Sequence, residues 1–252
     1  MNNKGGCGKT TTVWTIGDAW ARMGKKILFV DLDSQSNLTS VVTNTDACTQ
    51  VWEKTIEDSF VGGPEYGLPI QHVSDFIDIV PADLSLSNFE QETASHDTRE
   101  WMLFEILEPY KDQYDFILID CPPALGLISS NALVASDYLV IVANPDGLSE
   151  RGANMVLQLY NRTTSNKRLK PELQIAGFIL TRTQRDNVSQ LYEKRFREQF
   201  GVHFIEPTIR RCTKLVQSVS FRTSLFEFAP EEKAAQEYLQ VAAELLQRVV
   251  IE

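Results

Sequence analysis

Short apolar runs alternate along the chain with longer segments in which apolar residues recur every three or four positions. The short runs are apolar on both faces, as are strands that helices cover on both sides. They predict strands at Ile27–Asp31, Ile77–Val80, Phe116–Asp120, Tyr138–Ala143 and Ile175–Thr181, with a weaker one at His203–Ile205. The longer segments predict helices near Lys9–Met23, Glu100–Leu107, Ala124–Ala135, Ser149–Arg162, Val188–Phe200 and Glu231–Val250. Together they predict an α/β fold with a doubly wound, mostly parallel sheet flanked by helices.

The chain is expected to form a single domain over residues 1–252, because no repeat or low-complexity linker divides it. Residues 44–75 have the weakest pattern, and four turn-forming residues predict an exposed excursion there: Gly62, Gly63, Pro64 and Gly67. The last predicted helix has an apolar face opposite a face rich in Glu and Gln. Membrane-binding helices carry a basic polar face instead. We therefore expect this helix to pack on the body of the domain.

Composition places the chain among ordinary globular proteins. Charged residues make up 23% and hydrophobic residues 43%, which excludes a disordered or collagen-like chain. The longest apolar runs fall far short of the roughly 20 residues that a membrane-spanning helix needs, and no signal peptide is recognised. The cysteines are scattered, so neither a zinc site nor a disulfide framework is indicated: Cys7, Cys48, Cys121 and Cys212. We expect a soluble cytoplasmic protein.

The net charge of −10 hides an uneven distribution. Residues 182–222 hold nine basic and four acidic residues, a local charge of +5, while the segments on either side are acidic. A local positive segment can attract polyanions even in an acidic protein. On charge alone, however, a solvated face without a ligand is the simpler interpretation.

The most specific motif is K-G-G-x-G-K-T-T at residues 4–11, which leads directly into the first predicted helix. Its turn is formed by Gly5, Gly6, Cys7 and Gly8. Such a turn directs successive N–H groups toward phosphate oxygens, and the helix N-terminus adds the positive end of its dipole. Lys9 is placed to reach the β- and γ-phosphates of a nucleotide, and the Thr10 hydroxyl to bind Mg²⁺. The motif therefore predicts a site for ATP and Mg²⁺.

Carboxylates follow two of the predicted strands. Asp31 and Asp33 come at the end of one strand, and Asp120 ends another. Ligands of open α/β sheets bind at the carboxyl ends of the strands. One carboxylate there can hold the metal, directly or through water, and another can position the attacking water.

With these residues, the chain resembles the ParA/Soj family of partition ATPases, in the deviant-Walker branch of P-loop proteins that also contains MinD. Three segments carry the resemblance: residues 4–12, residues 29–39 (FVDLDSQSNLT) and residues 115–132 (DFILIDCPPALGLISSNA). The tail at residues 226–246 follows the family's closing pattern. The resemblance covers nearly the whole chain, although residues 44–110 match only loosely.

The resemblance implies a role for each motif residue. Lys4 is the signature lysine that reaches across an ATP-sandwich dimer to the partner's nucleotide, and Thr11 joins Lys9 and Thr10 around the phosphates. Asp33 is the carboxylate that orients the hydrolytic water. Asp120 is the Walker B aspartate near Mg²⁺, and Asp31 supports the site.

The family also implies partners. ATP binding drives dimerisation, the dimer binds DNA without sequence preference at the nucleoid, and a ParB-like centromere-binding protein stimulates hydrolysis. The family's basic DNA-binding positions fall on Arg211 and Lys214, with Arg210 as an added charge. Phosphate contacts of this kind are sequence-blind and salt-dependent. Cys212 replaces an Asn that lies near the nucleotide base in the family, which leaves the base selectivity open.

Two further departures concern the loop after Asp33 and the start of the chain. Ser34 and Ser36 replace the family's Pro and Gly, which we expect to be tolerated. A P-loop normally follows a buried strand, and only three residues precede Lys4, so the first strand is expected to be missing from this chain. A start assigned too late, a slot filled by another segment or chain, and a disordered loop are three explanations. The chain as written is expected to bind ATP weakly.

Three functions remain open at this point. The leading hypothesis is an ATP hydrolase that segregates plasmid or chromosomal DNA. The second is a DNA-binding or regulatory relative that uses nucleotide as a switch with little turnover. The third is a MinD-like membrane-associated ATPase, which the acidic last helix disfavours, since no stable membrane association is expected of it. An iron–sulfur reductase component is weaker still, because Cys121 alone sits in a matching type of position.

Overall fold

The computed structural model describes residues 1–45, 52–93 and 98–250. Six strands are present in this part of the chain: β1 Ile27–Asp31, β2 Gln71–Ser74, β3 Ile77–Val80, β4 Phe116–Asp120, β5 Tyr138–Ala143 and β6 Gln174–Leu180. The first four form a sheet of order β2-β3-β1-β4, and β5 pairs with β6 in a second sheet. Every pairing is parallel except that of β2 with β3. The prediction of a mostly parallel sheet is confirmed.

The described residues contain eleven α-helices: α1 Lys9–Arg22, α2 Asn37–Val42, α3 Ile56–Gly62, α4 Phe89–Glu92, α5 Met102–Leu107, α6 Leu127–Ala135, α7 Gly147–Ser165, α8 Asn187–Phe200, α9 Thr213–Ser220, α10 Leu225–Phe228 and α11 Lys233–Val249. The six predicted helices are all among them, with ends displaced by up to three residues. No helix in these ranges is long and apolar enough to cross a membrane.

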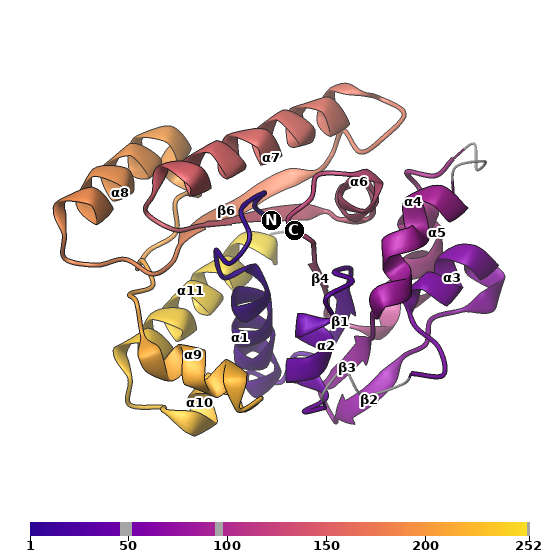
Figure 1. The fold of residues 1–252 in the computed structure, drawn as a ribbon, viewed down its shortest axis with the longest axis horizontal. Helices are drawn as coiled ribbons and strands as arrows, with labels where there is room; N and C mark the ends of the chain where they lie inside the picture. The colour runs from indigo at the N-terminus through magenta and orange to yellow at the C-terminus, as the bar shows by residue number, and fades with distance from the viewer. Residues whose placement is uncertain (46–51, 94–97, 251–252) are drawn as a thin grey trace.

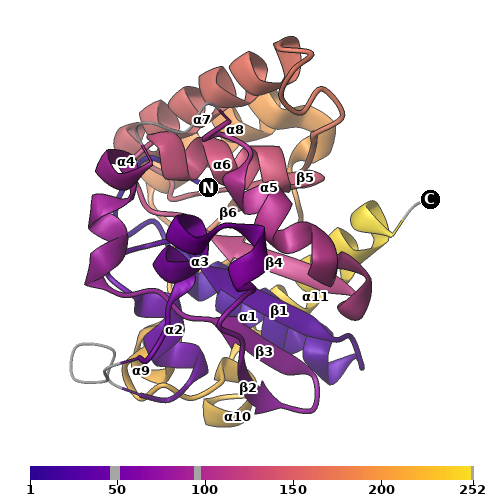
Figure 2. The same ribbon diagram turned by 90° about the vertical axis from the view of Figure 1, so that its right-hand side faces the viewer.

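Helices cover both faces of the strands (Figures 1 and 2). Helices α1 and α11 pack on one face, around buried residues such as Phe29 and Tyr238. Helices α3, α5 and α6 cover the other face of β1, and α7 and α8 cover β5 and β6. The Trp20 indole N–H donates to the Ala242 carbonyl at 2.8 Å, which ties α1 to α11. As expected, the last helix packs on the body of the domain.

One prediction about secondary structure is wrong, and another is confirmed only in part. The segment His203–Ile205 is not a strand, because residues Gly201–His203 form a 3₁₀ turn and Phe204 makes only an isolated bridge to Phe178. The segment at residues 44–75 includes α3, in which Ile56 and Phe60 are fully buried, but the excursion expected after it is exposed or half-buried at residues 62–67. Residues 46–51 of this segment, with Cys48, lie outside the described residues. The other three cysteines are free thiols.

The sheet is interrupted between β4 and β5. In the described residues β4 pairs with β1, β5 pairs with β6, and the two strands do not pair with each other. The chain start lies at this interruption, near the centre of the molecule (Figure 1). The Met1 amino group donates to the Val140 carbonyl at 2.5 Å, and the Val142 N–H donates to the Met1 carbonyl at 3.2 Å. The position at which the sequence predicts a missing strand is therefore a break in the sheet.

Candidate functional site

The K-G-G-x-G-K-T-T motif forms a turn that ends in the first residue of α1. Gly6 and Gly8 have positive φ angles of 71° and 91°, in the left-handed region that glycine adopts without strain. Gly8 is also the N-cap of α1, so the free N–H groups of the helix start face the same space as the turn. Buried Cys7 anchors the turn, because its carbonyl accepts a hydrogen bond of 3.0 Å from Thr181. This is the geometry of an anion-binding loop.

The Lys9 side chain is buried against this loop. Its ammonium group donates to the Lys4 carbonyl at 3.4 Å, so a positive charge lies under the turn. Thr11 and Gly8 line a cavity of about 790 Å³ that extends away from the loop. Cys212, Thr181 and Tyr238 line the same cavity. The cavity therefore joins the loop to the segment that contains Cys212.

Thr10 and Asp120 meet at the carboxyl end of β4. The Thr10 hydroxyl donates to Asp120 Oδ2 at 2.5 Å, while the buried Oδ1 has no hydrogen-bond partner among the described residues. Burial raises the pKa of Asp120 to about 6, although the Thr10 hydrogen bond and the Lys9 charge oppose this shift. A buried carboxylate oxygen without a partner is costly unless a cation binds it.

The donor set at Thr10 and Asp120 fits Mg²⁺. Both groups offer oxygen, the ligand that this ion prefers, and Mg²⁺ is usually held by one or two protein groups together with phosphates and water. Accordingly, no group of three or more metal-ligating side chains occurs in the described parts of the chain. The structure brings together the two residues that the sequence assigns to the metal.

Asp31 and Asp33 have different environments after β1. Asp31 is fully buried, and its Oδ2 accepts hydrogen bonds from the backbone N–H and hydroxyl of Thr39 at 2.9 and 2.8 Å. Its Oδ1 accepts from the Asp33 N–H at 3.1 Å. Burial and the nearby Asp120 raise the pKa of Asp31. Asp33 is only half-buried, so its carboxylate is accessible to water, and Asp31 holds the loop that carries it.

Ser36 closes this loop with a positive φ of 53°. The position is the one at which the family pattern has Gly, which adopts such angles freely. Ser36 is buried and lies directly before α2. The loop therefore keeps its left-handed residue despite the substitution.

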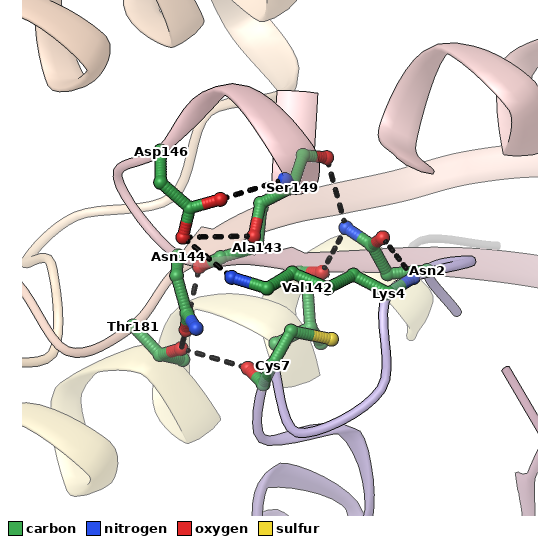
Figure 3. A network of polar contacts seen from close by, with 9 residues as sticks. All are labelled: Asn2, Lys4, Cys7, Val142, Ala143, Asn144, Asp146, Ser149 and Thr181. Carbon is green, nitrogen blue, oxygen red and sulfur yellow. Dashed lines mark hydrogen bonds and ion pairs between the residues drawn. The ribbon is translucent and has the colours of Figure 1, made fainter. Parts of the chain in front are cut away.

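Lys4 is held within its own chain (Figure 3). Its ammonium group forms an ion pair of 2.6 Å with Asp146, the N-cap residue of α7, which also accepts a hydrogen bond from the Ser149 N–H. Partial burial raises the pKa of Asp146, but the Lys4 and Ser149 contacts outweigh burial and lower it. Asn2 supports Lys4, because its side chain accepts from the Lys4 N–H and donates to the Val142 carbonyl.

Asp146 and Thr181 are site residues that the sequence reasoning missed. Asp146 follows the end of β5, and Thr181 directly follows β6, so both lie at the carboxyl ends of parallel strands. This position was the available signal, since ligand sites of open α/β sheets occur there. Their contacts with Lys4 and Cys7 join the second sheet to the phosphate loop (Figure 3).

The three expected DNA-binding residues lie at and before the start of α9. They differ in how far their positive charge is offset by a neighbouring carboxylate. Arg210 forms an ion pair of 2.5 Å with Glu237, which offsets its charge. Arg211 is exposed and makes a long hydrogen bond of 3.4 Å to Gln184. Lys214 is exposed, with its ammonium group 5.6 Å from the centre of the Phe228 ring. Arg211 and Lys214 therefore present the accessible positive charge of this segment.

The chain matches a known protein family and is similar over nearly its whole length to several known proteins. A protein-family model described as "AAA domain" matches residues 1–175. The sporulation initiation inhibitor protein Soj of Bacillus subtilis is 32% identical, covering 97% of this chain and 95% of its own length. The chromosome-partitioning ATPase Soj of Treponema pallidum is 30% identical, covering 98% and 96%. Among solved structures, cobyrinic acid a,c-diamide synthase from Mycobacterium smegmatis, with bound ADP and magnesium, is 25% identical over 99% of this chain and 93% of its own, with a TM-score of 0.82.

Proposed function

Because the chain belongs to the ParA/Soj family of P-loop ATPases, we propose that it partitions DNA by an ATP-dependent cycle of dimerisation and DNA binding. The observation that carries the ATPase chemistry is the Thr10–Asp120 pair beside the phosphate loop, with a buried carboxylate oxygen left free for a cation. ATP and Mg²⁺ are the proposed cofactors, since the names of similar proteins include ATPases and a complex with ADP and magnesium.

The loop and Lys9 would bind the β- and γ-phosphates of ATP. The N–H groups of the loop and of the α1 N-terminus supply hydrogen bonds, and the Lys9 ammonium supplies charge. Thr10 and Asp120 would hold Mg²⁺, which neutralises phosphate charge when bound. Half-buried Asp33 would accept a hydrogen bond from a water molecule and orient it toward the γ-phosphate.

Dimerisation would require Lys4 to change partner. In the family, this lysine reaches the nucleotide of the second subunit, whereas here it pairs with Asp146 of its own chain at 2.6 Å. Phosphate oxygens carry more negative charge than one carboxylate and can compete for the ammonium group. ATP in a facing subunit would therefore favour the dimer by taking Lys4 from Asp146.

DNA would bind at the start of α9. Arg211 and Lys214 are exposed there, in the segment of charge +5, and both can contact phosphates without reading bases. Arg210 would contribute less, because Glu237 already accepts its hydrogen bonds. A ParB-like protein with a basic segment could bind the acidic remainder of the surface and stimulate hydrolysis.

ATP hydrolysis and DNA binding, measured with and without duplex DNA, test this proposal. Asp33→Ala should abolish turnover while ATP binding persists, and Arg211→Glu should weaken DNA binding while basal turnover persists. The matched control Lys167→Glu reverses an exposed charge outside residues 182–222 and should change neither. Turnover that survives Asp33→Ala would contradict the catalytic assignment, and unchanged DNA binding in Arg211→Glu would contradict the DNA site.

A further inference from the structure

The loop that carries Asp33 is closed at both ends by one buried carboxylate, that of Asp31. Its Oδ1 accepts from the Asp33 N–H at 3.1 Å, and its Oδ2 accepts from the Thr39 N–H at 2.9 Å. The Thr39 N–H belongs to the first turn of α2, where N–H groups have no partner within the helix. The N-cap residue Ser36 makes no side-chain capping bond, so the Asp31 carboxylate takes that place. Both ends of the loop therefore depend on where this carboxylate lies.

The hydroxyl of Thr39 fixes that carboxylate to the neighbouring strand. It donates to Asp31 Oδ2 at 2.8 Å and accepts from the Ala82 N–H at 3.1 Å. A backbone N–H can only donate, which leaves the hydroxyl proton for Asp31. A hydroxyl has one proton and two lone pairs, so both bonds form at once. All three residues are fully buried, and bulk water does not compete for these bonds.

The contact with Ala82 lies just beyond the ladder between β1 and β3. These strands pair in parallel, and their last paired residues are Val30 and Val80. Asp31 directly follows Val30, and Ala82 lies two positions after Val80. The Thr39 hydroxyl therefore continues the connection between β1 and β3 past the ladder, and it sets the position of the loop relative to the sheet.

A second threonine of this segment shows that the contact is not the usual one for a helical threonine. Threonine hydroxyls in helices can donate to the carbonyl four residues earlier. Thr43, at the end of α2, does so with a hydrogen bond of 2.7 Å to the Thr39 carbonyl. Thr39 instead directs its hydroxyl at Asp31. This bond is a tertiary contact rather than a local one.

We propose that Thr39 is a positioning residue for ATP hydrolysis, whose hydroxyl holds the Asp31 carboxylate and with it the loop that presents Asp33. This role of Thr39 rests on the role proposed for Asp33. Without the hydroxyl, the Ala82 N–H loses its acceptor and Asp31 Oδ2 loses one of its two bonds with Thr39. The carboxylate is then free to turn and the loop to shift. A misplacement of about 1 Å can cost about 100-fold in rate.

Steady-state ATP hydrolysis by the full chain, with Mg²⁺, tests the role of the hydroxyl. Thr39→Val replaces the hydroxyl by a methyl group, and Thr39→Ser keeps it. The matched control Thr43→Val removes a hydroxyl of the same segment that donates to the Thr39 carbonyl instead of to Asp31. In Thr39→Val, kcat should fall at least about tenfold while KM for ATP stays within about twofold. Thr39→Ser and Thr43→Val should stay within about threefold of wild type in both constants.

Three kinetic results would overturn the proposal. An unchanged kcat in Thr39→Val would show that the hydroxyl does not position Asp33. An equal loss in Thr39→Ser or Thr43→Val would show a general disturbance of α2. A rise in KM that accounts for the whole loss of kcat/KM would place the effect on ATP binding.

Asp33→Ala in the same assay separates this role from the one on which it rests. Full turnover in Asp33→Ala would overturn the catalytic role of Asp33. Loss of turnover in Asp33→Ala, together with none in Thr39→Val, would overturn the role of Thr39 alone.

Hydrogen exchange in the unmodified, nucleotide-free protein covers the case in which Thr39→Val does not fold. The amides of Asp33, Thr39 and Ala82 bond either to the Asp31 carboxylate or to the hydroxyl that holds it. They should therefore open together, with protection factors that agree within about tenfold. An Asp33 amide that exchanges as in an open loop, while those of Thr39 and Ala82 stay protected, would overturn the proposal. In folded Thr39→Val, the Asp33 amide should lose protection by at least about tenfold, and in Thr43→Val it should not.

Discussion

The buried carboxyl group of Asp120 should make the nucleotide-free protein less stable as the pH rises. Its pKa is raised to about 6 by burial in the folded protein, against 3.8 as its ordinary value. Between these values the folded state binds more protons than the unfolded state, so the free energy of unfolding falls with increasing pH. This loss of stability is absent below pH 3.8, the pKa of Asp120 in the unfolded protein. It is complete above about pH 6, the pKa in the folded protein.

The expected size follows from this shift. Two pKa units correspond to about 3 kcal/mol in all, of which about 1.4 kcal/mol develops between about pH 5 and pH 8. Asp31 also has a raised pKa and acts in the same direction, so the wild-type profile alone does not isolate Asp120. The informative quantity is the difference in the free energy of unfolding between wild type and Asp120→Asn. In this variant Asn keeps an acceptor for the Thr10 hydroxyl and does not ionise.

Urea unfolding without nucleotide or Mg²⁺, at about pH 5 and pH 8, provides the measurement. The free energy of unfolding of wild type should fall by about 1.4 kcal/mol more than that of Asp120→Asn over this interval. The control Asp75→Asn removes an exposed carboxylate and should follow wild type. Parallel profiles for wild type and Asp120→Asn would refute the reasoning, because they would mean that the buried oxygen carries no pKa shift.

Three other substitutions test the charged contacts around the site. Asp146→Asn should release Lys4 and increase ATP-dependent dimerisation in analytical ultracentrifugation; unchanged dimerisation would show that the ion pair does not restrain Lys4. Arg210→Ala should lower the free energy of unfolding by about 0.5 kcal/mol in urea titrations, because Glu237 loses the guanidinium and keeps only the backbone N–H of residue 210. Its DNA affinity should change less than that of Arg211→Ala, and the opposite order would contradict the roles proposed here. Arg211→Ala should reduce the slope of log affinity against log salt by about 0.9 in fluorescence titrations, and an unchanged slope would exclude a phosphate contact.

The strands and the phosphate loop were predictable because local sequence determines them. β1, β3, β4 and β5 have the predicted ends, since a strand covered on both faces must be apolar throughout. The edge strand β2 carries no such signal, because three of its four residues are polar and most are exposed. The strand wrongly predicted at His203–Ile205 shows the reverse case, in which apolar residues pack against the core without forming a ladder.

The features of the candidate site also fall into two groups, those that the sequence indicated and those that only the structure revealed. The glycines, Lys9 and Thr10 are neighbours in sequence, and Asp120 is marked by the strand that it ends, so sequence alone indicated a phosphate and metal site. Contacts between distant segments were not visible at this level. The pairing of Lys4 with Asp146, which lies 142 positions later, depends on how α7 is placed against the loop.

The sequence by itself determined an α/β chain of the ParA/Soj family with a phosphate loop and three carboxylates at strand ends, because periodicity and motif spacing are local properties. The tertiary structure decided which charges are free and which are already paired. It showed that Arg210 is neutralised by Glu237, that Asp120 keeps an unpaired buried oxygen, and that Lys4 is held by its own chain. It also placed Met1 at the interruption between β4 and β5, since hydrogen bonding across a sheet joins residues that no local pattern connects.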